Sequence, residues 1–282
     1  MREKFAHGGS REYRFLALKR AIRAKKGNQM AQVLHGRGPV TATATKSRKK
    51  RPFILDLYST AVGKKYAMAI TGIGLMGFVL FHMIGNLKMY LGASDLDHYA
   101  EFLKKLAYPL APEGAVLWLL RGGLVSMAIV HIHAAISLTR LNRTARPVRY
   151  QSERDYQIAN FASRSMRWTG VTVFLFIVWH LLDLTWGVTN TIGTDGDFVK
   201  ADVYDNVVRS FDRWPVAAFY VLANIALGVH LFHGAWSLFQ SMGWNNPRFN
   251  KWRRAFASGF ATIVVVGNVS FPIAVLAGVV GG

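Results

Sequence analysis

The chain has 282 residues, of which 51% are hydrophobic and only 18% are charged, below the roughly 25% that is usual for soluble domains. Lys and Arg nevertheless outnumber Asp and Glu by 35 to 15, which gives a net charge of +20. The absence of cysteine excludes a disulfide framework, a thiol nucleophile, a Cys-ligated zinc site and an iron–sulfur cluster held by this chain alone. Apolar bulk and positive charge must therefore be segregated along the chain.

The N-terminal segment carries most of the charge. The first 65 residues contain 17 Lys and Arg against three acids and account for +14 of the total. We interpret 1–51 as a basic arm. Apolar side chains recur at helical spacing within 11–26, namely Phe15, Leu18 and Ile22. This pattern is typical of an interfacial helix, and a disordered basic arm is the alternative.

So basic a protein also suggests nucleic-acid binding. The arm, however, interleaves few aromatic residues with its basic ones and contains no recognised nucleic-acid motif. It directly precedes a long apolar segment, and basic clusters in that position favour an anionic membrane surface. We therefore expect membrane lipid beside the arm and no nucleic-acid partner.

Five apolar segments follow the arm. Each is at least 23 residues long and holds little charge: 66–91, 115–138, 166–188, 216–240 and 256–280. That length crosses a hydrocarbon core of about 30 Å at about 1.5 Å per residue. The sequence therefore predicts an all-α integral membrane protein in which 52–282 forms a bundle of five transmembrane helices. No internal repeat of convincing length is evident.

The connections between these segments predict the orientation. The first 65 residues, the second connection and the fourth connection hold 27 Lys and Arg, whereas the first and third connections hold five. Basic residues accumulate on the cytoplasmic side of membrane proteins. We therefore expect a multi-pass protein of the inner (cytoplasmic) membrane, with the N-terminus in the cytoplasm and the C-terminus outside.

Six of the nine histidines lie inside the predicted spans, on four of the five helices: His82, His131, His133, His180, His230 and His233. Ionisable side chains at membrane depth are costly and usually functional. At about 1.5 Å per residue, His82 and His180 lie roughly 20–25 Å from the cytoplasmic end of their spans. His133 and His233 lie only about 8–10 Å from it. The histidines thus form an outer layer and an inner layer.

Two histidines at one depth on different helices suit the two axial positions of haem iron. Two such pairs would stack two haems across the membrane as a path for electrons. Only one member of each close pair, His131 with His133 and His230 with His233, needs to be a ligand. A different class, a transporter with a proton relay of histidines and Asp183, uses the same residues. The alternative for Asp183 is a structural ion pair with Lys88 or Arg121.

Several stretches, in this order, resemble a known family. They run Ser59–Lys65 (STAVGKK), Phe81–Lys88 (FHMIGNLK), His133–Leu138 (HAAISL), Asn142–Pro147 (NRTARP), Trp179–Thr185 (WHLLDLT) and His230–Gln240 (HLFHGAWSLFQ). Together they are similar to the single-chain, five-helix cytochrome b membrane anchor of succinate dehydrogenase or fumarate reductase (respiratory complex II). The resemblance covers about 52–280 and leaves the basic arm unexplained.

The resemblance implies an electron-transfer role with two haems b. By motif position it assigns the ligand role to His82, His133, His180 and His233. It also implies a flavoprotein and an iron–sulfur subunit on the cytoplasmic face, with the dicarboxylate site on another chain and quinone as substrate. A higher oligomer is compatible with this arrangement. A mixed iron–sulfur cluster, with His from this chain and Cys from a partner, is the alternative cofactor.

A quinone carbonyl needs a hydrogen-bond donor in an apolar pocket at a membrane edge. Thr71 on the first span is one candidate donor. Trp236 and Gln240, at the cytoplasmic end of the fourth span, are the others.

Overall fold

The computed structural model describes residues 19–25, 52–145, 161–193, 197–244 and 246–281. The chain divides into two compact units, Met1–Arg51 and Pro52–Gly282. In the first unit, 19–25 is helical with exposed side chains, and it lies within the 11–26 helix expected from the sequence. The rest of that expected helix falls outside the described residues.

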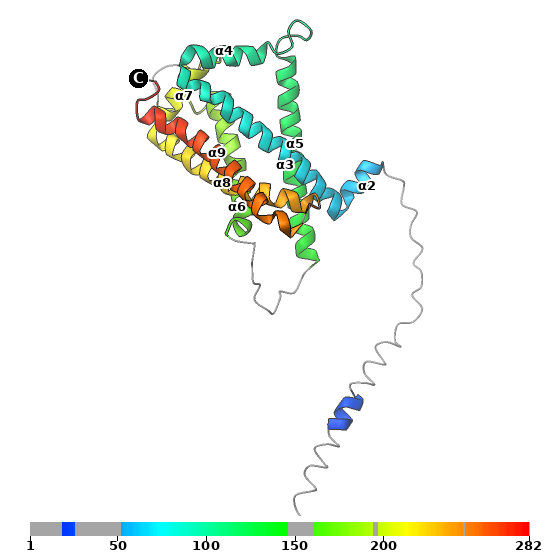
Figure 1. The fold of residues 1–282 in the computed structure, drawn as a ribbon. Helices are drawn as coiled ribbons and strands as arrows, with labels where there is room; N and C mark the ends of the chain where they lie inside the picture. Colours follow the sequence, from blue (N-terminus) through cyan, green and yellow to red (C-terminus); the bar gives the residue numbers. More distant parts are fainter. Residues whose placement is uncertain (1–18, 26–51, 146–160, 194–196, 245, 282) are drawn as a thin grey trace, which may run out of the picture. The chain divides into compact units, whose positions relative to one another are not determined.

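The second unit contains five long helices (Figure 1). They are α3 (Ala61–Asn86), α5 (Ala115–Thr144), α6 (Phe161–Leu184), α8 (Trp214–Ser241) and α9 (Asn250–Leu276). The 3-10 helix η1 (Leu87–Leu91) continues α3. All five are long and apolar enough to cross a membrane, and all regular structure in the described residues is helical. The prediction of an all-α protein with five membrane-spanning helices is thereby confirmed.

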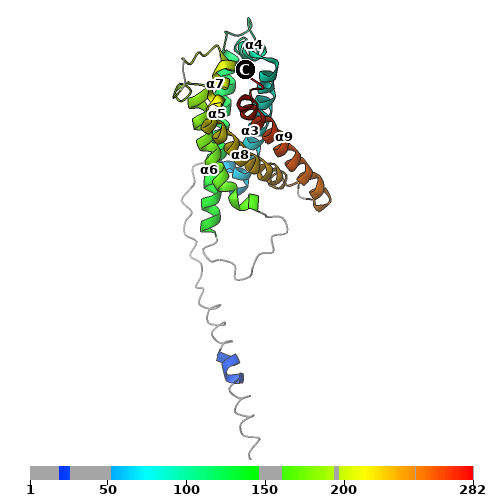
Figure 2. The ribbon, with the colours of Figure 1, turned by 90° about the vertical axis from the view of Figure 1, so that its left-hand side faces the viewer.

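Short helices connect the long ones. They are α2 (Phe53–Ser59), α4 (Ala93–Lys104), α7 (Val203–Asp212) and η2 (Pro247–Phe249). In both side views α4 and α7 lie together beside the C-terminal end of the described chain (Figures 1 and 2). We call this the α4 end of the bundle. The opposite end, where α2 precedes α3, is the α2 end.

Some helix ends differ from the predicted span ends, and local backbone bonding explains one difference. The fifth span ends at Leu276 rather than 280, because Gly278 adopts a left-handed φ of 67°. The amides of Gly278 and Val279 then donate to the carbonyls of Val275 and Ala274. This Schellman arrangement terminates helices. The third span similarly ends at Leu184, whereas α5 extends to Thr144.

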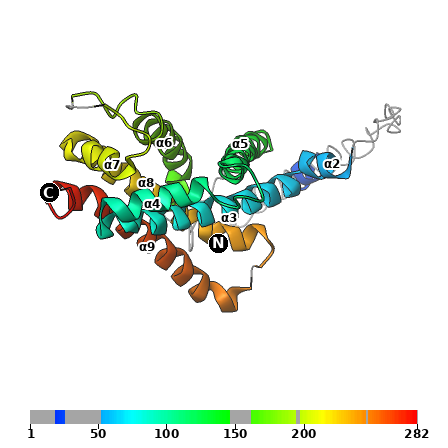
Figure 3. The same cartoon turned by 90° about the horizontal axis from the view of Figure 1, so that it is seen from above.

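The long helices cross one another, as seen from above (Figure 3), and α3 contacts α8 and α9 as well as α5. Helix α3 packs against α5, and α8 packs against both α6 and α9. Glycine allows the closest approach, because a Cβ on Gly228 of α8 would lie 2.3 Å from Cγ2 of Val265 on α9. Small residues at such crossings are a common device of membrane helix packing.

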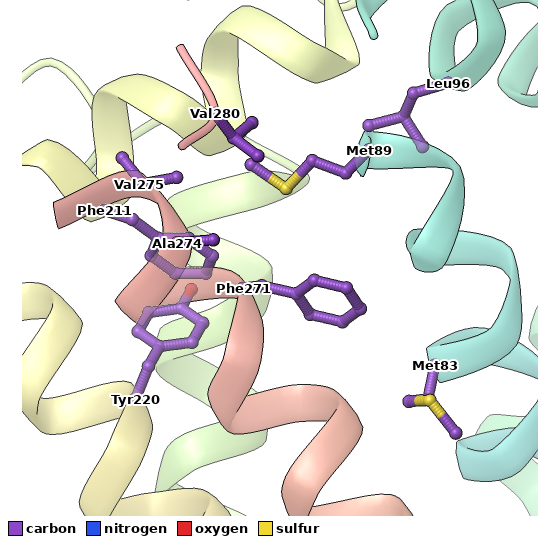
Figure 4. Close-up of a cluster of buried hydrophobic side chains, with 9 residues drawn as sticks. All are labelled: Met83, Met89, Leu96, Phe211, Tyr220, Phe271, Ala274, Val275 and Val280. Atoms are coloured by element: carbon purple, nitrogen blue, oxygen red, sulfur yellow. The ribbon is translucent and has the colours of Figure 1, made fainter. Parts of the chain in front are cut away.

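A buried apolar cluster closes the α4 end (Figure 4). Its members come from α3, η1, α4, α7, α8, α9 and the C-terminal segment: Met83, Met89, Leu96, Phe211, Tyr220, Phe271, Ala274, Val275 and Val280. Figure 4 shows Phe271 of α9 between the aromatic rings of Phe211 and Tyr220 and the methionines of α3 and η1. The cluster therefore fixes α7 and the ends of the long helices relative to each other.

Candidate functional site

His82 of α3 and His180 of α6 face each other near the α4 end. Their ring centroids lie 5.9 Å apart, with ring planes at 89°. Each histidine also contacts a phenylalanine four residues earlier on its own helix, Phe78 at 5.3 Å and Phe176 at 5.8 Å. The structure thus brings together the two histidines of the predicted outer layer, from helices that are far apart in the sequence, in an apolar, aromatic environment.

His131 of α5 is held by Thr71 of α3. Thr71 Oγ1 lies 3.2 Å from His131 Nδ1 and donates its own proton to the carbonyl of Ala67, at 2.7 Å. A hydroxyl has a single proton, so with that proton on Ala67 the Thr71 oxygen can accept a bond from an N–H at His131 Nδ1. The lone pair of His131 Nε2 is then available to a metal ion. Metal-binding histidines are commonly oriented in this way, by a hydrogen bond at the other ring nitrogen.

His230 of α8 has the same arrangement with α6. Thr169 Oγ1 lies 3.4 Å from His230 Nδ1 and donates to the carbonyls of Met166, at 3.1 Å, and Ser165, at 3.2 Å. His131 and His230 thus each have a threonine of a neighbouring helix beside Nδ1. We call these two residues the α2-end pair, and His82 with His180 the α4-end pair.

Glycines leave room beside the α2-end pair. A Cβ on Gly72 would lie 3.5 Å from His131 Cε1, and a Cβ on Gly170 would lie 3.5 Å from His230 Cε1. In both helices the glycine directly follows the threonine that holds the histidine. The backbones of α3 and α6 can therefore approach these imidazoles without a side chain between them.

These contacts reveal a sparse repeat that inspection of the sequence missed. Five residues of α3 recur 98 positions later on α6, in the same order: Met68, Thr71, Gly72, Phe78 and His82 match Met166, Thr169, Gly170, Phe176 and His180. Only five of the fifteen positions in 68–82 and 166–180 are identical. Of the other ten, some are apolar in both helices. The shared residues are the ones that touch the histidines, so the spacing of Thr-Gly and His was the signal that could have revealed the repeat.

The other two inner histidines have different surroundings. His133 Nδ1 lies 2.6 Å from the Tyr58 hydroxyl of α2, and the two rings stack at 5.7 Å. His233 is half-buried, and within the described part of the chain no hydrogen bond joins it to another side chain. The structure therefore does not place His133 and His233 as a contacting pair. Tyr58 and Thr169 were not among the residues singled out from the sequence.

The quinone candidates lie apart on two helices. The Thr71 hydroxyl is used by Ala67 and His131, as described above. Trp236 lies under the Arg253 guanidinium, 5.7 Å from the ring centroid, and Gln240 is exposed in the last turn of α8. Among the described residues there is also no group of three or more His, Asp or Glu side chains that could enclose a metal ion. The candidate ligands occur as pairs.

The structure thus has five long apolar helices, one contacting histidine pair and two histidines that each contact a threonine of a neighbouring helix. Residues 139–269, from the end of α5 into α9, match the model of the family described as succinate dehydrogenase/fumarate reductase transmembrane subunit. This part of the chain is therefore similar to the transmembrane subunits of that family. Comparisons with curated proteins and with solved structures gave no match.

Proposed function

We propose that this subunit carries electrons between the iron–sulfur subunit of its complex and membrane quinone, through two haems b that are each held by two histidines. The observation that carries the proposal is the ring contact between His82 and His180, together with the matching threonine contacts of His131 and His230. We take His82 with His180 as one ligand pair and His131 with His230 as the other. Thr71 and His82 are eleven residues apart on α3, so the pairs are separated by about 16 Å along that helix.

The residues present fit a haem with two histidine ligands. His82 and His180, whose ring centroids are 5.9 Å apart, would hold the iron of one haem. Thr71 and Thr169 hold Nδ1 of the other two imidazoles, and Gly72 and Gly170 leave space beside them. These contacts favour His131 and His230 over His133 and His233 as the second ligand pair.

Bound haem would supply one-electron chemistry, and the protein would hold and insulate it. The four histidines anchor the iron at fixed depths, the two threonines fix ring orientation, and Phe78 and Phe176 exclude water from the α4-end pair. Burial and hydrogen bonding of this kind set the potential of a haem.

The remaining roles follow from the charge distribution and the family. The basic connections at the α2 end would face the cytoplasm of a cell with this protein in its inner membrane and would receive the iron–sulfur and flavoprotein subunits, with the dicarboxylate site on the latter. Quinone would bind at the membrane edge near Trp236 and Gln240. Thr71 is less suited to quinone, because its hydroxyl already serves Ala67 and His131.

An optical spectrum of the purified complex tests this proposal. We expect sharp reduced bands of b type, a haem content of two per anchor chain and co-purifying soluble subunits. Absence of these bands with preserved succinate–quinone activity would instead support the His/Cys cluster shared with a partner. If no soluble subunit co-purifies and no cofactor absorbs, the electron-transfer role fails and a proton-relay transporter takes its place.

A further inference from the structure

Asp183 of α6 is completely buried and accepts hydrogen bonds from four side chains. Arg213 Nη2 donates at 3.0 Å, Tyr220 at 2.9 Å and Thr189 at 3.1 Å, and the Ser210 hydroxyl also donates to it. Four donors converge on two oxygens, which is the environment of an ionised carboxylate. The partner is Arg213, so the expectation that Asp183 pairs with Lys88 or Arg121 was wrong.

The donors come from separate elements. Thr189 lies after α6, Ser210 in α7, Arg213 between α7 and α8, and Tyr220 in α8. Arg213 also donates to the backbone carbonyls of Thr189, at 2.7 Å, and Ile192, at 3.1 Å. We call these four residues and Asp183 the Asp183 network. It ties the end of α6 to α7, α8 and the connecting segment.

Stability alone does not account for this network. Removing two charges from water costs about as much as their attraction returns, so buried ion pairs are often no better than well-packed apolar residues. Asp183 is, moreover, the only Asp or Glu within the five long apolar helices. An acid in a membrane span is a candidate for function.

The network adjoins the α4-end pair. Asp183 follows His180 by three residues, about one helical turn, so the two side chains share a face of α6. Tyr220 links them, because its hydroxyl donates to Asp183 while its ring lies 6.0 Å from the His180 ring. No corresponding acid lies on the spans beside His131 and His230.

We infer that the Asp183 network positions His180 and sets the midpoint potential of the redox centre held by the α4-end pair. This inference rests on the proposed function. A fixed negative charge stabilises the oxidised, more positive form of a centre, and an apolar surrounding strengthens the effect. Asp183 therefore lowers the potential, and Arg213 moderates that effect. Both act through the field and through Tyr220, and neither is a ligand.

Opposite charge changes test the inference in the complete complex. We expect Asp183→Asn to raise the midpoint potential of the centre at His82 and His180 in a redox titration. Arg213→Gln should lower it, because the carboxylate loses its counter-charge. The centre at His131 and His230 is the internal reference and should not shift. A merely structural role would disturb the first centre in the same direction in both variants, and that result, or unchanged potentials, overturns the inference.

A third variant decides the matter if Asp183→Asn does not assemble. Tyr220→Phe keeps the ring against His180 and the charge of every group, and removes one hydrogen bond from the carboxylate. We expect it to lower the same potential, by less than Arg213→Gln does. An unchanged or raised potential contradicts the inference. Failure of the proposed function is seen separately, as a parent complex without two b-type centres.

Discussion

At the scale of residues, the contact between the Thr71 hydroxyl and His131 can be tested by substituting Thr71, which leaves every histidine in place. Thr71→Val keeps the shape of the side chain and removes the oxygen that accepts from Nδ1. Loss of such a supporting bond typically weakens metal affinity by roughly tenfold or more. We therefore expect Thr71→Val to lose or spectrally shift the haem at the α2-end pair, measured by low-temperature reduced-minus-oxidised spectra.

Thr71→Ser is the matched control, because it keeps the hydroxyl and loses only a methyl group. Its spectrum should equal that of the parent. If Thr71→Val also has the parent spectrum, Thr71 does not support a ligand, and the assignment of His131 loses its main physical argument.

The choice among neighbouring histidines shows how far the sequence alone could reach at this scale. Depth counted from the span ends predicts two layers but has an error of several residues, and α5 extends six residues beyond the predicted span end. His131 and His133 differ by only about 3 Å in depth but by about 200° around the helix. Which face meets α3 depends on packing, and only the contact with Thr71 shows it.

At the scale of elements, the crossing of α8 and α9 depends on a glycine. Gly228→Ala would place a Cβ 2.3 Å from Val265 Cγ2, and the β-branched valine has little rotamer freedom in a helix. We expect a loss of roughly 1–3 kcal/mol in the free energy of unfolding, as for other overpacked sites. Thermal unfolding of the purified subunit in detergent measures it.

Gly259→Ala on α9 is the control for this experiment. No atom lies within 4 Å of its added Cβ, and alanine is favoured over glycine in helix interiors by up to about 1 kcal/mol. The unfolding temperature should stay equal or rise. A Gly228→Ala protein as stable as the Gly259→Ala protein would show that the helices do not approach so closely.

Long elements followed from the sequence and short ones did not. Twenty or more apolar residues have few other structures available in a bilayer, and so the five spans were predictable. Helices α4 and α7 are short, with charged residues such as Asp95 and Arg209, and neither length nor hydropathy distinguishes them from loops. The pairing of Asp183 with Arg213 depends on where α7 packs, so it could not be predicted from the sequence either.

At the scale of the whole molecule, the absence of native cysteine gives a direct test of orientation. Lys251→Cys lies near η2 at the α2 end and Lys200→Cys lies just before α7 at the α4 end, and each replaces an exposed lysine. We expect a membrane-impermeant thiol reagent to label Lys200→Cys on intact cells. Lys251→Cys should react only after permeabilisation. The reverse pattern would place the basic connections outside and contradict the proposed docking of the soluble subunits.

The haem content of matched histidine variants tests the central claim most directly. The complex is purified with His131→Ala, His133→Ala, His230→Ala or His233→Ala, and haem b per anchor chain is measured by the pyridine haemochrome method. We predict two haems in the parent and in the His133 and His233 variants, and one in the His131 and His230 variants. Loss of a haem on substitution of His133 or His233, with both retained on substitution of His131 and His230, would contradict the account.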